Sequence, residues 1–280
     1  MSDSQTAPAP LLTAQDFKSD IKPIWCPGCG DYSVLTALAK ACAELARPRA
    51  RIALISGIGC SSRLPAYTNV YGFHGVHGRA LALATGVKLA RPDLTVIAAG
   101  GDGDGLSIGG NHFLHACRRN VDMTYILMDN QVYGMTKGQA SPTTAPDWCE
   151  GKLTPTGTGI APVAPLQLAL AAGVGFFARG FAGNPNELAR LIVAGITHPG
   201  FAVIHVLSPC VTFRAEQRGW KQAVHGFDGA PATDPATAMA RFAGDDGFTT
   251  GILYASATPP FMPERQMTMT AADFDRGFIV

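Results

Sequence analysis

The sequence predicts an α/β protein built on a doubly wound parallel sheet. Short apolar runs of strand length alternate along the chain with longer segments in which apolar residues recur at helical spacing. Glycine-rich or polar loops separate these segments. Strands that are separated by helices pair in parallel, and the helices then cover both faces of the sheet. A chain of 280 residues that is 47% hydrophobic and 15% charged is long enough to bury such a core.

The order of the elements follows from the same patterns. The first unit is a helix over residues 31–46, with Pro48 beyond its end, followed by a strand over residues 51–56. Further strands are predicted at residues 94–99, 123–129, 176–180 and 201–207. The helices between them are predicted at residues 78–90, 106–118, 166–172 and 185–197.

Three segments lie outside this regular alternation. Residues 1–20, rich in Ala and Pro, are predicted to form a flexible or partner-contacting arm before a domain of residues 21–215. Residues 134–165 are predicted to be a functional loop or a partner contact, because structureless loops of this length are uncommon inside compact domains. Residues 216–280 form a predicted C-terminal extension that packs on the domain or on a partner subunit, with a short helix at 235–242 and a strand at 248–255.

Charge and hydropathy exclude several classes of partner. The net charge of +1 provides no basic stripe for nucleic acid. No apolar stretch reaches the roughly 18 to 20 residues of a membrane span, and residues 1–10 do not combine a basic region with an apolar one. We therefore expect a cytoplasmic protein with neither a nucleic-acid nor a membrane partner. Seven cysteines in such a chain favour metal binding, catalysis or packing over a disulfide framework.

The glycine-rich motif at residues 100–105 carries the most chemical information. Gly-Asp-Gly alone is usually only a turn after a strand. Here, however, Asp102 and Asn130 bracket one helix-plus-strand unit, and both follow strand ends, where open α/β sheets bind ligands. A carboxylate and an amide oxygen, beside glycines that let backbone approach a phosphate, suit Mg²⁺ together with a diphosphate. The pair predicts a Mg²⁺-diphosphate cofactor site.

Four cysteines occupy loops at the same predicted end of the sheet. Cys26 and Cys29 form a Cys-Pro-Gly-Cys motif, whereas Cys60 and Cys210 each follow a predicted strand. Four thiolates fit a tetrahedral zinc ion as well as a [4Fe–4S] cluster, and the spacing alone does not distinguish them. Two other cysteines lie within predicted helices and are expected to pack as small buried hydrophobes: Cys42 and Cys117.

Together these motifs resemble the β subunit of the 2-oxoacid:ferredoxin oxidoreductases, most closely the 2-oxoglutarate type, also called 2-oxoglutarate synthase. In this resemblance, Gly-Asp-Gly followed about thirty residues later by Asn is the thiamine diphosphate motif. The match extends over residues 24–213 and is carried by residues 25–30, 57–63, 74–80, 101–104 and 129–143. The resemblance implies a sheet of the thiamine diphosphate-binding type, in a domain that also holds an iron–sulfur cluster.

The resemblance also implies the cofactors and their ligands. Mg²⁺ would be held by Asp102, Asn130 and the backbone carbonyl of Val132. One [4Fe–4S] cluster would be held by Cys26, Cys29, Cys60 and Cys210; beside thiamine diphosphate, a cluster can accept single electrons, which zinc cannot. The cofactor-binding residues are expected to be Gly59, Cys60, Ser61, Ser62, His74, Gly75, Gly101, Asp102, Gly103, Asp104, Asn130, Val132, Tyr133, Gly134, Met135 and Thr136.

The implied reaction is the oxidative decarboxylation of 2-oxoglutarate with coenzyme A to succinyl-CoA and CO₂, reversible in principle, with electrons passing singly to ferredoxin. Arg63 and Lys137 are expected to bind the substrate carboxylates. Lys137 favours a dicarboxylic substrate, because family members that take pyruvate often lack it. His74 is expected to meet a diphosphate oxygen or the reacting carbonyl. A surface charge or an intersubunit ion pair is the competing interpretation of Arg63, and a helix cap that of His74.

Thiamine enzymes also need a glutamate from a pyrimidine-binding domain, and only one α/β unit is visible in this sequence. The resemblance therefore implies an α subunit that supplies this glutamate, in an αβ or α2β2 assembly. Three alternatives remain open: the same chemistry on pyruvate, branched-chain or aryl 2-oxo acids; a thiamine decarboxylase without redox chemistry; and a non-catalytic electron carrier or zinc-stapled binding subunit. The last leaves Asp102 and Asn130 without a role.

Overall fold

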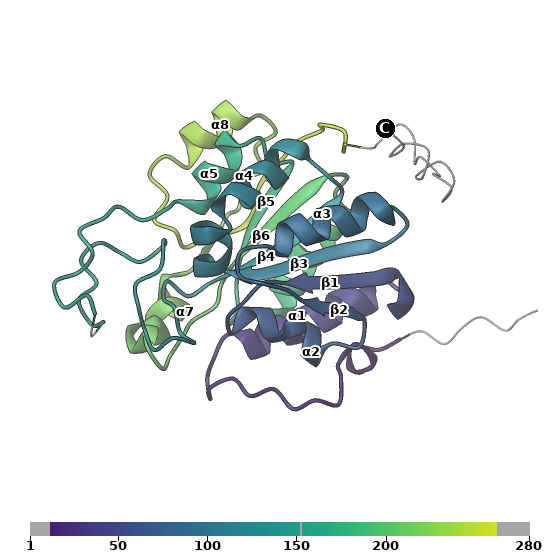
Figure 1. Ribbon diagram of the computed structural model, residues 1–280. Helices are drawn as coiled ribbons and strands as arrows, with labels where there is room; N and C mark the ends of the chain where they lie inside the picture. The colour runs from purple at the N-terminus through teal and green to yellow at the C-terminus, as the bar shows by residue number, and fades with distance from the viewer. Residues whose placement is uncertain (1–11, 152, 262–280) are drawn as a thin grey trace, which may run out of the picture.

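The computed structural model describes residues 12–151 and 153–261. Its core is one eight-stranded sheet in the order β2-β1-β3-β4-β6-β5-β8-β7, which is parallel except where β8 pairs antiparallel with β5. The strands are β1 (Ile52–Ser56), β2 (Tyr71–His74), β3 (Thr95–Gly101), β4 (Met123–Asp129), β5 (Phe176–Phe181), β6 (Phe201–Leu207), β7 (His225–Gly226) and β8 (Thr249–Ala255). Figure 1 shows the sheet running through the molecule between helices.

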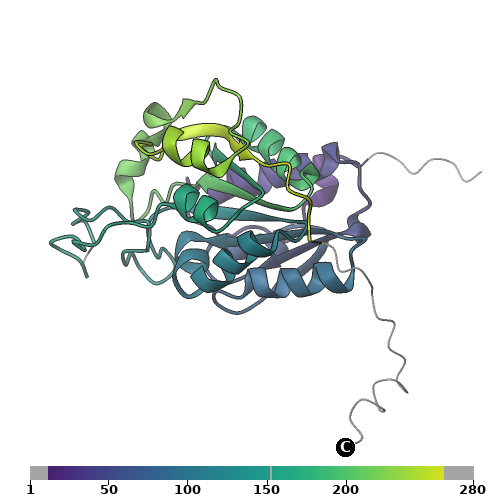
Figure 2. The ribbon, with the colours of Figure 1, turned by 90° about the horizontal axis from the view of Figure 1, so that it is seen from above.

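Helices cover both faces of the sheet, as Figure 2 shows from above. One face packs against α1 (Asp31–Glu44) and α6 (Pro185–Thr197), which share a core with Ile52 and Leu54 of β1. The other face packs against a set of four helices: α3 (Ala80–Ala90), α4 (Gly110–Arg119), α5 (Pro165–Ala171) and α8 (Pro235–Arg241). Alternate residues of each central strand point to opposite cores, so the central strands are apolar on both sides. The predicted doubly wound architecture is confirmed.

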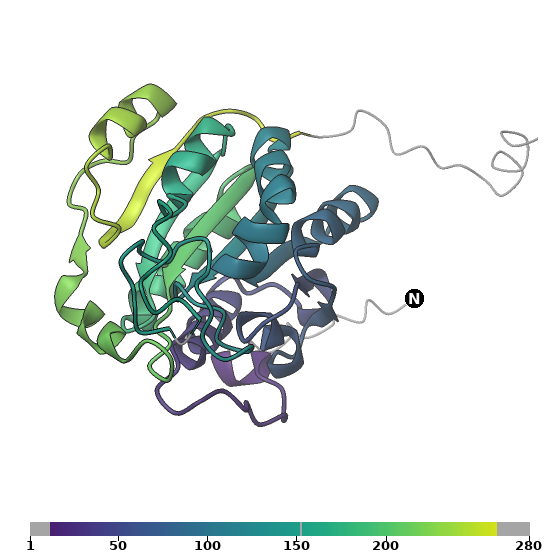
Figure 3. The same cartoon turned by 60° about the vertical axis from the view of Figure 1, so that its left-hand side comes forward.

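The order of the strands fixes where a ligand can bind. The chain moves from β1 to the edge strand β2, and then returns to place β3 and β4 on the other side of β1. This reversal leaves the loops after β1 and β3 diverging from adjacent carboxyl ends, which is where open α/β sheets bind ligands. The connection of residues 130–164 and α7 (Trp220–Ala223) lie at this same end (Figures 1 and 3).

Every strand and helix that the sequence predicted is present within a few residues of its expected bounds. The sequence analysis missed β2, because all four of its residues are exposed and it lacks the apolar run of a buried strand. It also missed the short helix α2 (Leu64–Tyr67). The helix was predicted to begin at Leu106. In the structure Leu106 belongs to a π-helical turn at Asp104–Ile108, and the α-helix α4 starts at Gly110. Between β4 and α5 the described residues contain no helix or strand, as predicted.

The described end of the predicted N-terminal arm packs on the domain. Residues 1–11 of the predicted arm lie outside the described residues, but a 3-10 helix at Ala14–Phe17 already packs on the domain. Phe17 is 1% exposed in the core beside α1, and Lys18 bridges to Thr68. Periodicity cannot predict this packing, because a single Phe in a polar segment has no periodicity.

The C-terminal extension packs on the domain where it is described. Its strand β8 extends the sheet beyond β5, and α8 joins the same core as α5. Residues 262–280 of the predicted extension lie outside the described residues. None of the helices in residues 12–151 and 153–261 has the length and apolar character that a membrane span requires.

Replacing Phe17 by Ala tests whether this segment belongs to the folded domain. We expect Phe17→Ala to lower the free energy of unfolding by about 3 kcal/mol, because the side chain is fully buried against α1. Ile21→Ala, whose side chain is 54% exposed, is the matched control and should change it by less than about 0.5 kcal/mol. Urea denaturation followed by circular dichroism measures both. Equal effects would show that the segment does not contribute to the core.

Candidate cofactor site

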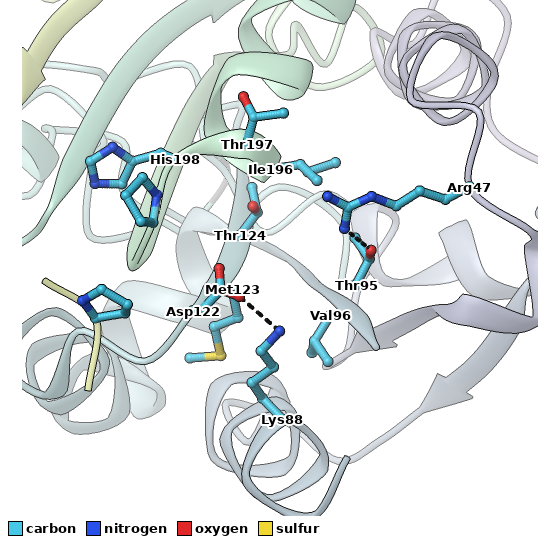
Figure 4. A pocket seen from close by; sticks show the side chains of 12 residues that line it. Arg47, Lys88, Thr95, Val96, Asp122, Met123, Thr124, Ile196, Thr197 and His198 are labelled. Carbon is cyan, nitrogen blue, oxygen red and sulfur yellow. Dashed lines mark hydrogen bonds and ion pairs between the residues drawn. The ribbon is translucent and has the colours of Figure 1, made fainter. Parts of the chain in front are cut away.

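Two of the hollows in the described part of the structure differ in place and in chemistry. The larger, of about 340 Å³, lies at the amino ends of β3 and β4, where Figure 4 shows Lys88 paired with Asp122 and Arg47 bonded to Thr95. No glycine or cysteine is among the described residues that line it. The smaller, of about 110 Å³, lies at the strand reversal and is called the switch-point pocket below. It is lined by Ile58, Gly59, Cys60, Ser61, His77, Gly101, Asp102, Gly103, Asp104, Asn130, Val132, Tyr133, Gly134, Met135 and Thr136.

Asp102 is a buried carboxylate of the switch-point pocket, only 2% exposed. Its Oδ2 accepts hydrogen bonds from the hydroxyls of Ser141 and Thr143, the latter at 2.8 Å. The same Thr143 hydroxyl lies 2.8 Å from Oδ1 of Asp129. Burial, and then the charge of Asp129, raises the pKa of Asp102 to about 7. A cation beside Asp102 would offset the cost of burying two carboxylates this close together.

Asn130 follows β4 directly and closes a tight turn. Its side-chain Oδ1 accepts a hydrogen bond from the backbone N–H of Val132 at 3.1 Å, and Gln131 between them has a positive φ of 56°. Asn130 and Val132 line the pocket together with Asp102. Mg²⁺ accepts as ligands the carboxylate of Asp102, the amide oxygen of Asn130 and the backbone carbonyl of Val132. The amide oxygen retains a second lone pair beside its hydrogen bond. The three residues therefore fit the predicted magnesium site.

Asp104 ties three loops together at the wall of the pocket. Its Oδ1 accepts hydrogen bonds from the backbone N–H groups of Ile58 at 3.0 Å and Gly78 at 2.8 Å. Nδ1 of His77 lies 3.0 Å from the same oxygen. Gly57 has to be glycine, because a Cβ there would collide with the Asp104 carboxylate. Burial raises the pKa of Asp104, so its hydrogen bonds and a nearby positive charge are needed to keep it ionised.

The loops that carry the predicted cysteine ligands contact one another. Nε1–H of Trp25, next to the loop of residues 26–30, donates to the backbone carbonyl of Cys60 at 2.8 Å. At the other end of the same loop, the backbone N–H of Gly30 donates to the carbonyl of Pro209 at 3.1 Å. The structure thus brings together three loops that are far apart in sequence.

The thiols themselves lie close enough for their charges to interact. Cys29 interacts with Cys60 and Cys210, and Cys26 also interacts with Cys60 and Cys210. Among the described residues, no three His, Cys, Asp or Glu side chains converge tightly enough to hold a single metal ion. Burial raises the pKa of Cys29 and Cys210, and that of Cys60 to about 11. Bound metal is therefore needed to keep them as thiolates at neutral pH. Cys42 and Cys117 are buried in the two cores, as predicted.

Gln217 links the cysteine loops to the switch-point pocket. It is 1% exposed on the 3-10 helix at Ala215–Gly219, its Oε1 accepts from the backbone N–H of Cys210 at 2.8 Å, and its Nε2–H donates to the carbonyl of Asn130 at 2.7 Å. Cys60 also belongs to both places, because it lines the pocket. The sequence analysis missed Gln217, since a glutamine in a segment without periodicity carries no signal.

Comparison with known proteins decides the family. Residues 57–206 match the model of the thiamine pyrophosphate enzyme, C-terminal TPP binding domain. The chain is 48% identical over 199 residues to the 2-oxoglutarate oxidoreductase subunit KorB of Mycobacterium tuberculosis, and 42% identical over 222 residues to a 2-oxoacid:ferredoxin oxidoreductase subunit beta of Aeropyrum pernix. The chain belongs to the β subunits of the 2-oxoacid:ferredoxin oxidoreductases.

The comparisons extend over most of this chain. The alignments cover 71% of it with the Mycobacterium relative and 79% with the Aeropyrum relative. The chain spans 53% of the length of the former and 72% of the latter. A 2-oxoglutarate:ferredoxin oxidoreductase from Magnetococcus marinus, solved with 2-oxoglutarate, coenzyme A and succinyl-CoA bound, superposes with a TM-score of 0.85 at 43% identity. That match covers 89% of this chain and 87% of that one, and it confirms the predicted fold.

Most of the residues that the sequence analysis predicted to bind the cofactor line the switch-point pocket. Ser62, His74 and Gly75 are not among its lining residues. Ser62 is buried beneath the pocket, where its carbonyl accepts a hydrogen bond from the Ser56 hydroxyl, and His74 ends the exposed edge strand β2. His77, three residues after His74, lines the pocket instead, as does Ile58. Recognising β2 would have placed His74 on a strand before the loop.

The two predicted substrate-binding cations lie near the pocket without lining it. Arg63 ends the short helix that begins at Ser61, and its charge acts on the thiol of Cys60. Lys137 is exposed, directly after the lining residue Thr136, on backbone with a positive φ of 89°. Neither side chain makes a hydrogen bond or an ion pair with the described part of the chain. Their role in binding substrate stays a prediction.

Gly103→Ala tests whether the switch-point pocket binds thiamine diphosphate. A Cβ at Gly103 would collide with the ring of Tyr133, whose hydroxyl donates to the Gly103 carbonyl at 3.2 Å. Overpacking of this kind costs about 1 to 3 kcal/mol, so we expect the dissociation constant of the cofactor to rise by about 5- to 100-fold. The matched control is Gly86→Ala, on the exposed side of α3 with open space around it. Fluorescence titration with thiamine diphosphate and Mg²⁺ measures both, and equal affinities would contradict the assignment.

Proposed function

We propose that this chain is the thiamine-binding subunit of a 2-oxoglutarate:ferredoxin oxidoreductase. The proposed reaction converts 2-oxoglutarate and coenzyme A to succinyl-CoA and CO₂, with two electrons leaving singly through one [4Fe–4S] cluster to ferredoxin. Support for the substrate comes from relatives named for 2-oxoglutarate and from the neighbour solved with 2-oxoglutarate and succinyl-CoA bound.

The observation that carries the proposal is the shared use of Cys60. Its loop lines the pocket that contains Asp102 and Asn130, and the same loop contacts the one that begins with Cys26. A decarboxylase without redox chemistry has no need for cysteines beside the cofactor, and an electron carrier has no need for the aspartate and the asparagine. Only a thiamine enzyme that delivers electrons to a cluster uses both sets.

Separate sets of residues in this chain would bind the metal, the diphosphate and the cluster. Asp102, Asn130 and the Val132 carbonyl would hold Mg²⁺, which would offset the negative charge of the diphosphate. Gly101 and Gly103 line the pocket and, without side chains, would let the backbone approach the diphosphate. When bound, thiamine diphosphate supplies the carbanion stabilisation that decarboxylation of a 2-oxo acid requires. Cys26, Cys29, Cys60 and Cys210 would hold the cluster, with every sulfur as thiolate.

Two cationic side chains and an exposed apolar surface near the pocket are the proposed contacts with the substrate and the α subunit. Arg63 and Lys137 have cationic side chains near the pocket that no group in the described part of the chain pairs with. They would bind the substrate carboxylates, Arg63 through two parallel hydrogen bonds. An α subunit would cover the pocket and supply the activating glutamate. Consistent with a covered surface, Met135 and Ile108 are 44% and 54% exposed near the pocket.

Lys137→Ala tests the dicarboxylate preference. We expect the KM for 2-oxoglutarate to rise by about 10- to 100-fold, because the variant loses a charged hydrogen bond of about 1.5 to 3 kcal/mol to the distal carboxylate. Pyruvate has no distal carboxylate, so its turnover should not change. Lys40→Ala, on the distant helix α1, is the control. Steady-state assays of the αβ complex with a viologen acceptor measure these values, and equal changes for both substrates would refute the role of Lys137.

Metal analysis tests the cluster. We expect about four irons and four acid-labile sulfides per chain in anaerobically purified complex, with a low-temperature EPR signal after dithionite reduction. Cys60→Ser should lose this signal, whereas Cys149→Ser, at an exposed cysteine, should retain it. Zinc without sulfide would refute the oxidoreductase assignment and leave a structural metal site.

A further inference from the structure

A line of buried polar side chains connects the switch-point pocket with the C-terminal extension. It begins at Asp129, the last residue of β4, which is 2% exposed. Oδ1 of Asp129 lies 2.8 Å from the hydroxyl of Thr143 and accepts a hydrogen bond from the backbone N–H of Gln131 at 3.0 Å. The first contact reaches Asp102 through the Thr143 hydroxyl, and the second closes the turn that contains Asn130. Asp129 is therefore linked to Asp102 through Thr143 and to the turn of Asn130 through Gln131.

The next group in the line is His205, in the middle of the adjacent strand β6. Its Nε2 lies 2.9 Å from Oδ2 of Asp129, and its Nδ1 lies 3.1 Å from Nε of Arg179 on β5. A guanidinium only donates hydrogen bonds, so Nδ1 must be the acceptor. The ring proton is then on Nε2 and is donated to Asp129. Burial lowers the pKa of His205, in agreement with this neutral form.

The side chain of Arg179 contacts the C-terminal extension. Its Nη1 lies 2.8 Å from Oδ2 of Asp245 and donates to the carbonyl of Thr249 at 3.2 Å, where β8 begins. The side chains of Arg179 and Asp245 are 2% and 3% exposed. A buried cation between two neutral or apolar strands is costly unless it is paired, so Asp245 is needed to keep Arg179 in place.

We propose that His205 and Arg179 are positioning residues for the magnesium-binding loop, and that the C-terminal extension supports this loop through Asp245. None of the three lines the switch-point pocket, so they act through Asp129. In metal sites, such outer hydrogen bonds orient the ligands, and their loss typically weakens metal binding by about 10- to 100-fold. The inference rests on the proposed thiamine site and adds a function for residues on β5, β6 and the extension.

The test compares three replacements of His205 in the full chain purified with its α subunit. A glutamine side chain offers an N–H for Asp129 and a carbonyl for Arg179, so His205→Gln preserves both hydrogen bonds. His205→Leu preserves neither, and His205→Asn has the same amide but is one methylene too short to reach both partners. Arg190→Met, an exposed arginine of α6, is the control for the purification and the assay.

The primary readout is the dissociation constant of Mg²⁺ at saturating thiamine diphosphate, from titration calorimetry, with circular dichroism and thermal melting as checks of folding. We expect about 10- to 100-fold weaker Mg²⁺ binding for His205→Leu and His205→Asn, and a value within about threefold of the parent for His205→Gln. If His205→Leu does not fold, the Mg²⁺ dissociation constants of His205→Gln and His205→Asn are compared instead, and their difference tests the proposal.

Two results would overturn the proposal: parent-like Mg²⁺ affinity in a folded Leu or Asn variant, and equal weakening in Gln and Asn. Failure of the unmodified complex to bind thiamine diphosphate and Mg²⁺ would instead refute the proposed function itself. The two failures are thus distinguished by the parent protein.

Discussion

The burial of three carboxylates at one end of the sheet is the constraint on which the rest of the site depends. Asp102, Asp104 and Asp129 are 2–4% exposed and lie at the carboxyl ends of the two adjacent strands β3 and β4. Each needs donors close by, because an unpartnered buried charge costs several kcal/mol. The long connection therefore returns to the site with two hydroxyls, and the loops after β1 and β2 turn their backbone N–H groups inward. A cation bound among these groups would complete the compensation.

The same constraint brings the two proposed redox centres close together. The loop after β1 must approach Asp104 with the N–H of Ile58, and two residues later it presents Cys60 to both the pocket and the other cysteine loops. Gln217 then connects Cys210 to Asn130 through one amide group. A short path between the proposed cofactor and the proposed cluster would thus follow from loops that are already fixed by hydrogen bonds.

The sequence was sufficient for the central sheet and for bringing Asp102 and Asn130 to one pocket. Central strands are apolar on both faces, so each appears as a short run such as residues 123–129, and Asp102 and Asn130 follow these runs directly. It was insufficient wherever one side of an element faces solvent or a single side chain makes the contact. The edge strand β2 has no apolar run, Phe17 is one aromatic residue in a polar segment, and Gln217 is recognised only from its two partners in space.

Polar residues inside the predicted buried strands are a further signal in the sequence. The runs that form β5 and β6 contain Arg179 and His205 among apolar residues, in strands that the alternation with helices already predicts to be buried. A cation in the centre of a buried strand requires a partner, and in a parallel sheet that partner must come from a neighbouring strand or from a segment that covers the sheet edge. Here both occur, with His205 on β6 and Asp245 before β8. Polar residues inside predicted central strands therefore indicate which distant segments must pack together, which hydrophobic periodicity cannot show.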